Sequence, residues 1–310
     1  MLVLVAPGQG AQQPGLLTPW LELPGVSDRI AEWSAAIDLD LVHYGTEAGA
    51  EEIRDTAVAQ PLLVATALVS AGALLDERDP AGVLGAVAGH SVGELAAASL
   101  AGVLSPLDAM SLVRTRGKAM AEAAAVTETG MSAVLGGDPE QVTAHLEKLG
   151  LTPANVNGGG QIVAAGTAEQ LAALSEDKPE KARVIPLKVA GAFHTQHMAP
   201  AEPVLESAVA GVEAHDPAVP YVSNLDGAVV AEGSEVVRRL VHQISASVRW
   251  DLCMETFAAR GATAMVELCP GGTLTGLAKR GLRGVQTLAL KSPDDLDAAR
   301  ELIAEHTPTA

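Results

Sequence analysis

A serine stands between two glycines where two sequence patterns meet, in the stretch AVAGHSVGELAAASLAG at residues 86–102. An apolar run ends at Gly89, and an alanine-rich, helix-prone run begins after Gly93. The pattern predicts a buried strand, a sharp turn and a helix, because a tight turn leaves little room for Cβ atoms. A strand that leads directly into a helix is typical of a parallel sheet with helices on its faces.

Residues 89–93 fit the G-x-S-x-G pattern of a nucleophile elbow. Such a turn lifts the Ser91 hydroxyl above the strand end and leaves the backbone N–H of Val92 without a partner in the helix. That N–H and the helix dipole are then free to stabilise an oxyanion. The alternative is a glycine-rich loop whose serine only caps the helix. The strand before the serine and the helix after it favour a nucleophile.

A serine hydroxyl is a weak nucleophile until a base takes its proton. In GAFHTQHM, His194 is the leading candidate for this base and His197 is the reserve. His90 is expected to be a buried supporting residue, since neighbouring strand residues point to opposite faces. Four other histidines lie in charged or polar stretches and are expected to be solvated: His43, His145, His215 and His306.

The order of elements predicts an α/β fold with a large hydrolase-like domain. Residues 2–5 predict a buried strand and residues 107–125 a helix. Residues 60–75 predict a buried helix with Pro61 in its first turn, where proline is tolerated. Together with the serine turn, these elements predict a parallel sheet covered by helices.

A second pattern begins after about residue 126. Residues 127–191 follow a β-α-β-β-α-β order that closes with a strand at residues 182–191. This order predicts a small ferredoxin-like α+β domain. We expect it to be inserted into the large domain, which residues 1–126 and 192–310 would form.

Composition excludes several classes of function. The chain has 20 Lys and Arg against 38 Asp and Glu, a formal net charge of −18, which argues against nucleic acid as a partner. Cys253 and Cys269 are too few for a disulfide framework and lack metal-ligand spacing. The first residues have a short apolar run and no basic segment, so we expect no signal peptide, no membrane span and a cytoplasmic protein.

Eight motifs together resemble the malonyl-CoA:acyl carrier protein transacylase family of fatty acid and polyketide synthesis. They run in family order from Pro7 to about Leu277: APGQGAQ, QPLLVA, GHSVGE, RTRGKAM, NVNGGGQIVAAG, GAFHTQHM, YVSNLDG and CPGGTLTGL. The resemblance implies a ping-pong transfer of a malonyl group from malonyl-CoA, through a malonyl-serine, to the phosphopantetheine thiol of an acyl carrier protein. It implies no metal and no redox cofactor.

The resemblance also implies the roles of individual residues. Ser91 would attack the thioester, and His194 would act first as general base and then as acid to the leaving thiol. The N–H groups of Val92 and Gln9 would form the oxyanion hole. Gln243 would supply the acceptor that orients the histidine, through either its side chain or its carbonyl.

Helix spacing gives Arg116 a buried position. The residues three and four positions away on either side are all apolar: Leu112, Val113, Ala119 and Met120. Arg114 and Lys118 share another face. A buried guanidinium needs an anion, and a carboxylate matches its two-pronged geometry. The resemblance makes this anion the malonyl carboxylate; the alternative is an internal ion pair with Asp or Glu.

Further substrate contacts follow from the same resemblance. Phe193 would oppose an α-methyl branch on the acyl group, a filter that supplies only about 1–3 kcal/mol. Asn157 and Gln161 match the family's N…GQ pattern and would line the channel. Gln60 would also bind substrate, and the equally weighted alternative for it is an ordinary polar residue near a helix start.

A basic run in the acidic chain is a candidate docking patch for the acidic carrier protein. It comprises Lys279, Arg280 and Arg283, with possible help from Arg114 and Lys118. For any one of these side chains, an ordinary solvated helix face is the stronger alternative. Two other functions compete with the transferase. A serine thioesterase or lipase would share the elbow but leaves Arg116 unexplained, and a degenerate interaction subunit would not need Ser91, His194 and Arg116 together.

Overall fold

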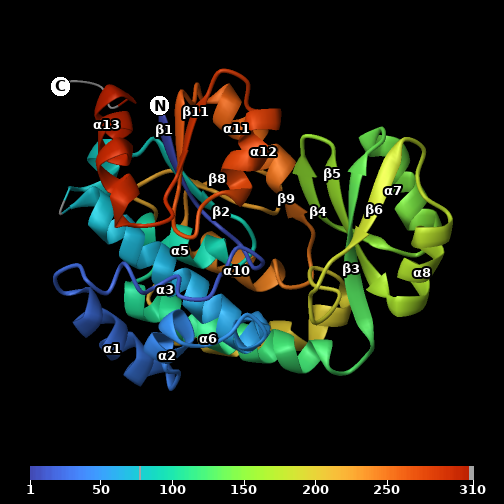
Figure 1. Ribbon diagram of the computed structural model, residues 1–310, viewed down its shortest axis with the longest axis horizontal. Helices are drawn as coiled ribbons and strands as arrows, with labels where there is room; N and C mark the ends of the chain where they lie inside the picture. Colours follow the sequence, from blue (N-terminus) through green and yellow to red (C-terminus); the bar gives the residue numbers. More distant parts are fainter. Residues whose placement is uncertain (77, 307–310) are drawn as a thin grey trace.

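The computed structural model describes residues 1–76 and 78–306, and its centre is a six-stranded sheet (Figure 1). The strands are β1 (Leu2–Ala6), β2 (Ala86–Gly89), β7 (Tyr221–Val222), β8 (Val229–Val230), β10 (Ala264–Glu267) and β11 (Gln286–Ala289). Their order is β11-β10-β1-β2-β7-β8, and the first five are parallel, whereas β8 is antiparallel to β7. The predicted parallel sheet is therefore confirmed, with one antiparallel strand added at its edge.

Two hydrophobic cores lie on the two faces of this sheet. The side chains of Leu2 and Leu4 on β1 join the core that includes α3, α5, α6 and α13. Those of Val3 and Val5 join the core beneath α11 and α12, as the two-residue period of a strand requires. These helices are α3 (Thr56–Leu75), α5 (Gly93–Leu100), α6 (Pro106–Ala124), α11 (Trp250–Ala259), α12 (Thr273–Gly281) and α13 (Leu296–His306).

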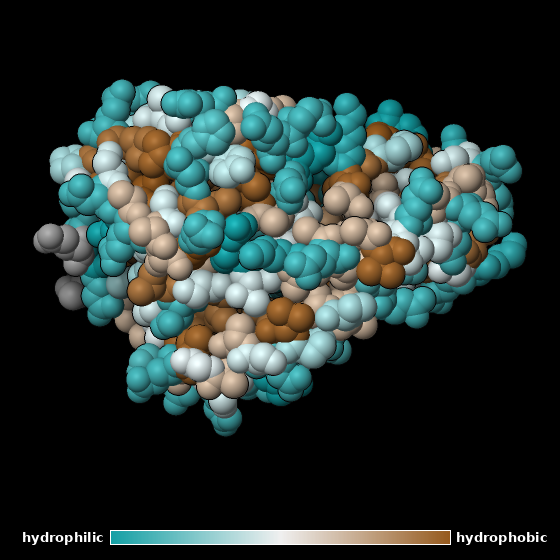
Figure 2. All heavy atoms as spheres, turned by 90° about the horizontal axis from the view of Figure 1, so that it is seen from below, coloured by the Kyte–Doolittle hydropathy of each residue, from teal (hydrophilic) through white to brown (hydrophobic). Residues whose placement is uncertain are grey.

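Further helices complete the large unit. They are α1 (Val26–Ile37), α2 (Leu41–Thr46), α4 (Pro80–Val83), α9 (Glu202–Val209) and α10 (Gly233–His242), with 3-10 turns η1 (Glu52–Arg54), η2 (Gln196–Ala201) and η3 (Pro293–Asp295). On the face shown in Figure 2, brown apolar patches are interrupted by polar side chains. Helix α3 is long and apolar enough to cross a membrane, but 89% of its apolar stretch is buried in the fold, so it is a core helix.

Helix α3 begins earlier than the sequence predicts. It starts at Thr56, with the Asp55 side chain accepting a hydrogen bond from the N–H of Ala57, so Pro61 lies inside the helix and not in its first turn. Proline cannot donate to the carbonyl four residues earlier. That carbonyl, on Ala57, instead accepts a hydrogen bond of 2.8 Å from Arg114 Nη1. The neighbouring helix α6 thus replaces the missing bond.

The small unit has the predicted order of elements. Its strands are β3 (Thr129–Gly136), β4 (Thr152–Gly158), β5 (Gln161–Thr167) and β6 (Ala182–Pro186), and its helices are α7 (Pro139–Lys148) and α8 (Ala168–Glu176). The sheet order β6-β3-β5-β4, with each neighbouring pair antiparallel, is that of a ferredoxin-like fold. The side chains of Asp138 and Thr167 cap the two helices.

Two details of the small sheet differ from the expectation. The closing strand ends at Pro186 rather than Gly191. Leu187 still donates to the Met131 carbonyl of β3, and Leu187 and Val189 line a cavity. A fifth strand, β9 (Val248–Arg249), comes from outside residues 127–191 and pairs parallel with β4.

Candidate active site

The turn after β2 has the geometry that its glycines suggest. Ser91 adopts a left-handed conformation with φ 52°. A Cβ at Gly89 would lie 1.9 Å from the backbone carbon of Gly93, and one at Gly93 would lie 2.4 Å from the Ala6 carbonyl oxygen. Only glycine fits at these two positions, so the chain can turn sharply from β2 into α5 and expose Ser91 at the corner.

The loop after β1 lies against this corner because β1 and β2 are adjacent, with Ala6 opposite Gly89. A Cβ at Gly8 would lie 2.7 Å from the His90 carbonyl oxygen, so Gly8 permits the close approach. No described residue accepts a hydrogen bond from the backbone N–H of Gln9 or of Val92. Both donors of the expected oxyanion hole are therefore available.

His194 lies beside Ser91, as the sequence led us to expect. Its Nε2 is 2.7 Å from Ser91 Oγ, and it is only 3% exposed. Burial and, secondarily, the charge of Arg116 lower its pKa from 6.5 to about 3. The imidazole is therefore neutral near pH 7 and can take a proton at Nε2. His197, the reserve candidate, does not line the serine cavity.

Gln243 connects the histidine to the rest of the site. Its backbone carbonyl is 2.8 Å from His194 Nδ1, so the carbonyl and not the side chain orients the imidazole. This contact places the donor proton on Nδ1 and leaves Nε2 as the acceptor toward Ser91. The Gln243 side chain serves a different partner, since its Oε1 accepts from Arg116 Nη2 at 2.9 Å.

Arg116 is buried, at 1% exposure, and points toward the serine. Its Nη2 is 3.3 Å from Ser91 Oγ, and its Nη1 donates to Gln60 Oε1 at 2.7 Å. Burial lowers its pKa to about 10, and the charge of Glu94 opposes this shift. Among the described ion pairs Arg116 has none. Neutral amides hold the guanidinium, so its charge is still available to an anionic ligand.

Two buried residues behind the serine are not among the site residues predicted from the sequence. The Asn224 Oδ1 accepts from the Ser91 backbone N–H at 2.8 Å. Glu94, three residues after Ser91, accepts from the Asn224 backbone N–H at 2.7 Å and from Gln243 Nε2. Both residues lie within quoted motifs, GHSVGE and YVSNLDG, but only the folded chain brings them together.

A cavity of about 80 Å³ opens at Ser91 between the two sheets. It is lined by Gln9, Gln60, His90, Ser91, Met120, Met131, Asn155, Val163, Leu187, Val189, Phe193 and His194. Phe193 and Gln60 thus lie where expected. Gln60 lies within α3 beyond its first turn, not at the helix start.

Three expectations about the cavity were wrong. Asn157 and Gln161 do not line it: Asn157 Oδ1 bonds His90 Nε2 at 2.8 Å, and Gln161 lies behind Asn157. Asn155, two residues earlier on β4, lines it instead, and the pairing of β4 with β5 is irregular between Val156 and Gly158. His90 lines the cavity beside Ser91, because both residues follow the end of β2 and escape strand alternation.

The basic candidates separate into two groups. Lys118, Lys279, Arg280 and Arg283 are exposed. Arg114 is not available for docking, because it donates to the backbone carbonyls of Ile37, Asp38 and Ala57. Arg114 has this internal role because Pro61 cannot donate to the Ala57 carbonyl.

Comparison with known proteins places the chain in a family. The model of the acyl transferase domain matches residues 3–298. The malonyl CoA-acyl carrier protein transacylase of Mycobacterium bovis is 53% identical over 97% of this chain and 100% of that protein. The crystal structure of MCAT from Mycobacterium tuberculosis has a TM-score of 0.93 and 52% identity, over 96% of this chain and 99% of that one.

A third relative was solved with a partner. It is a malonyl-transacylase in complex with a type II polyketide acyl-carrier protein, with a TM-score of 0.89, 30% identity and coverage of 97% of this chain and 99% of the other. These matches extend over almost the entire sequence and agree with the motifs around Ser91, His194 and Arg116. The chain belongs to the acyl transferase domain family and, within it, to the malonyl-CoA:acyl carrier protein transacylases.

Proposed function

We propose that this protein transfers the malonyl group of malonyl-CoA to the phosphopantetheine thiol of an acyl carrier protein. The observation that carries the proposal is the meeting of three side chains at one corner. Ser91 Oγ lies 2.7 Å from the neutral imidazole of His194 and 3.3 Å from the buried guanidinium of Arg116. A nucleophile and its base thus line one cavity, and a cation for a carboxylate contacts the nucleophile.

In the first half-reaction, Ser91 Oγ attacks the thioester carbonyl while His194 Nε2 takes its proton. The negative charge on the carbonyl oxygen would be stabilised by the N–H groups of Val92 and Gln9, aided by the N-terminus of α5. His194 then returns the proton to the departing CoA thiolate. The product is a malonyl ester on Ser91.

Arg116 would bind the free carboxylate of the malonyl group. A malonyl ester on Ser91 carries this carboxylate two carbons from the ester carbon, within reach of a guanidinium whose Nη2 already contacts Oγ. Two parallel N–H bonds to the carboxylate would fix its direction. Acetyl groups lack this anchor, so Arg116 provides selectivity for a dicarboxylic acyl group.

In the second half-reaction, the carrier-protein thiol replaces CoA. His194 takes the thiol proton, the thiolate attacks the ester carbonyl, and Ser91 leaves with the proton returned from His194. Every step uses groups of the chain itself, and we propose the reaction without a metal or redox cofactor. We also propose that it takes place in the cytoplasm.

Two features of the surroundings adapt the site to this reaction. Phe193 borders the cavity beside the base and would oppose an α-methyl branch, as in methylmalonyl-CoA. The exposed residues Lys279, Arg280 and Arg283 would contribute to docking of the acidic carrier protein. The carrier could belong to fatty acid or to polyketide synthesis.

Intact-protein mass spectrometry tests the proposal. The protein is mixed with malonyl-, methylmalonyl- or acetyl-CoA, with and without a holo acyl carrier protein. We expect a malonyl adduct on Ser91 that persists without the carrier and disappears when the carrier is added. Steady release of free malonate without any acceptor would identify a hydrolase instead, and the absence of any adduct would contradict the mechanism.

A further inference from the structure

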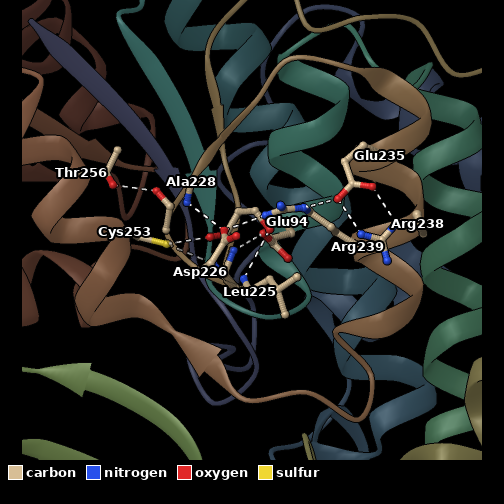
Figure 3. A network of polar contacts seen from close by, with 12 residues as sticks. Glu94, Leu225, Asp226, Ala228, Glu235, Arg238, Arg239, Cys253 and Thr256 are labelled. Atoms are coloured by element: carbon tan, nitrogen blue, oxygen red, sulfur yellow. Dashed lines mark hydrogen bonds and ion pairs between the residues drawn. The ribbon is translucent and has the colours of Figure 1, made fainter.

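Glu94 is a buried carboxyl group that none of these steps uses. It lies in the first turn of α5, three residues after Ser91, and is 1% exposed. Figure 3 shows it between the segment that carries Leu225, Asp226 and Ala228 and the α10 residues Glu235, Arg238 and Arg239. An ionised carboxylate in such a place must receive hydrogen bonds from its surroundings.

Both carboxyl oxygens of Glu94 face N–H donors. Oε1 accepts from the Asn224 backbone N–H at 2.7 Å, and Oε2 accepts from Gln243 Nε2. The charges of Arg116 and Arg239 favour the carboxylate. Arg239 itself pairs with Asp226 and Glu235. The other titratable neighbours are Tyr221 and Cys253, whose pKa values are raised well above their usual range by burial and, next, by the charge of Glu94.

The Glu94 carboxylate is one of the acceptors that determine which way the Gln243 amide points. An amide side chain has nearly the same shape in its two flipped orientations, so its hydrogen-bond partners decide between them. Glu94 Oε2, the Ser91 carbonyl at 3.1 Å and Asn224 Oδ1 at 3.3 Å all accept from Nε2, so Oε1 faces Arg116 Nη2 at 2.9 Å. The backbone carbonyl of the same residue holds His194 Nδ1. One glutamine thus connects the carboxylate to both the base and the cation.

We propose that the ionised Glu94 carboxylate is a positioning residue, which holds Gln243 in the one orientation that keeps His194 and Arg116 in place around Ser91. The inference rests on the proposed roles of these three residues. A protonated Glu94 would present an O–H donor to a neighbour that is also a donor. Only the contacts of Nε2 with the Ser91 carbonyl and Asn224 Oδ1 would then oppose a flip that turns the NH₂ group toward the N–H groups of Arg116 and removes the contact there.

This arrangement has a pH signature. Burial raises the pKa of Glu94 to about 7, against the opposing effect of the Asn224 N–H, while the pKa of His194 is lowered to about 3. Near neutral pH, His194 therefore stays neutral while Glu94 changes its charge. We expect the activation of Ser91 to fall as the pH drops through about 7.

The test measures how fast Ser91 reacts with phenylmethylsulfonyl fluoride, from about pH 5.5 to about pH 8.5, across the expected transition. In this reaction the Ser91 Oγ–S bond forms, the S–F bond breaks, and the serine proton leaves through His194 with fluoride as the leaving group. The same pH series is run for single-turnover acylation by malonyl-CoA. Adducts are counted by mass spectrometry.

We expect the natural protein to show an inflection near neutral pH. Glu94→Gln should react about tenfold to a hundredfold more slowly at high pH, because the reacting groups are misplaced, and should lack the inflection. Glu94→Asp keeps the charge and should be slower but retain an inflection. The matched control is Glu267→Gln, which removes a second fully buried carboxylate, at 0% exposure, whose oxygens accept from backbone N–H groups at the start of α12. It should keep the natural rate and inflection.

A natural rate and inflection in Glu94→Gln would overturn the inference, as would loss of the inflection in Glu267→Gln. If Glu94→Gln does not fold, Glu94→Asp decides, because an unchanged rate in that variant would also overturn it. Failure of the proposed function would look different. Ser91 would then react with the sulfonyl fluoride in the expected pH-dependent way, yet malonyl-CoA would leave no adduct.

Discussion

Two strand-to-helix corners of the large sheet are built from similar elements but differ in whether their backbone donors are paired. At each, a parallel strand ends, a helix begins soon after, and a fully buried glutamate lies close by: Glu94 in the turn from β2 to α5, and Glu267 at the end of β10 before α12. Glu267 accepts from the backbone N–H groups of Gly272, Leu274 and Thr275 at 2.8, 2.9 and 2.8 Å. It therefore satisfies three backbone donors at the start of α12.

The first corner is left open. The N–H of Val92 has no acceptor among the described residues, and Glu94 binds the Gln243 amide and the Asn224 N–H instead of the first turn of its own helix. The comparison shows that burial of a carboxylate does not mark a reactive site. The unpaired donors beside a nucleophile do, because they are what a ligand can still bind.

The largest effect should come from removing the nucleophile at the open corner. Ser91→Ala should lower transfer by about a thousandfold or more, since neither the base nor the oxyanion donors can act without the hydroxyl. The measurement is the malonyl adduct by intact-protein mass spectrometry. Ser111→Ala, at an exposed position on α6, is the matched control. A covalent malonyl group in Ser91→Ala would show that another residue is the nucleophile.

Removing the cation should have a smaller and selective effect. Arg116→Ala should reduce malonyl transfer by about a hundredfold, because the carboxylate loses a buried charged partner. Acetyl transfer should be unchanged or improved. Rates with malonyl- and acetyl-CoA are compared for the same preparation, so differences in folding cancel. An equal loss for both acyl groups would contradict the proposed role of Arg116.

The closed corner should respond in stability and not in chemistry. Glu267→Gln removes one acceptor from three backbone donors and should lower the free energy of unfolding by about 1–3 kcal/mol. Urea unfolding measures this loss. The acylation rate of the folded variant should stay within about twofold of the natural rate, since molecules that remain folded keep an intact Ser91 corner. A large rate loss would mean that the two corners are coupled.

The smallest effect concerns the pH dependence of stability. The pKa of His194 falls from 6.5 to about 3 on folding, so the free energy of unfolding decreases as the pH drops through this range. Glu94 acts in the opposite direction: its pKa rises from 4.5 to about 7, so its ionisation destabilises the fold as the pH rises. Between pH 4.5 and 6.5 the two groups therefore change the free energy of unfolding in opposite directions.

Single variants should separate the effects of Glu94 and His194 on the pH dependence of stability. In Glu94→Gln, the free energy of unfolding should decrease more steeply on acidification than in the natural protein, by at most about 1.4 kcal/mol per pH unit. In His194→Gln, it should decrease less steeply or increase. Urea unfolding at a series of pH values measures both. Parallel curves for the natural protein and both variants would contradict the assigned pKa shifts.

Local patterns predicted the parts of the site that lie within one segment. The glycines around Ser91 indicated the corner, and apolar neighbours at helical spacing indicated that Arg116 is buried. The ferredoxin-like order came from helix caps and strand patterns. The GAFHTQHM segment made His194 the leading candidate for the base. Motif resemblance was needed for Gln243, because nothing in the spacing relates residue 91 to a residue more than a hundred positions away.

Contacts across the chain account for what was missed. Glu94 and Asn224 are 130 positions apart, and neither has a local pattern that indicates their contact. Pro61 wrongly suggested a helix start. It lies inside α3 because Arg114, from another helix, donates to the Ala57 carbonyl that the proline leaves without a donor. His90 was assigned to the wrong face because strand alternation stops where β2 ends. In each case tertiary contacts override a sound local rule.

Strand β9 has a practical consequence for anyone who divides this chain. It pairs with the outer edge of β4 through Asn155 and Val156, although it lies more than fifty residues beyond β6. A fragment of residues 127–191 expressed alone would carry a bare strand edge, which invites association with other copies. A soluble fragment would need a substitute strand at β4, for example a synthetic peptide containing residues 248–249.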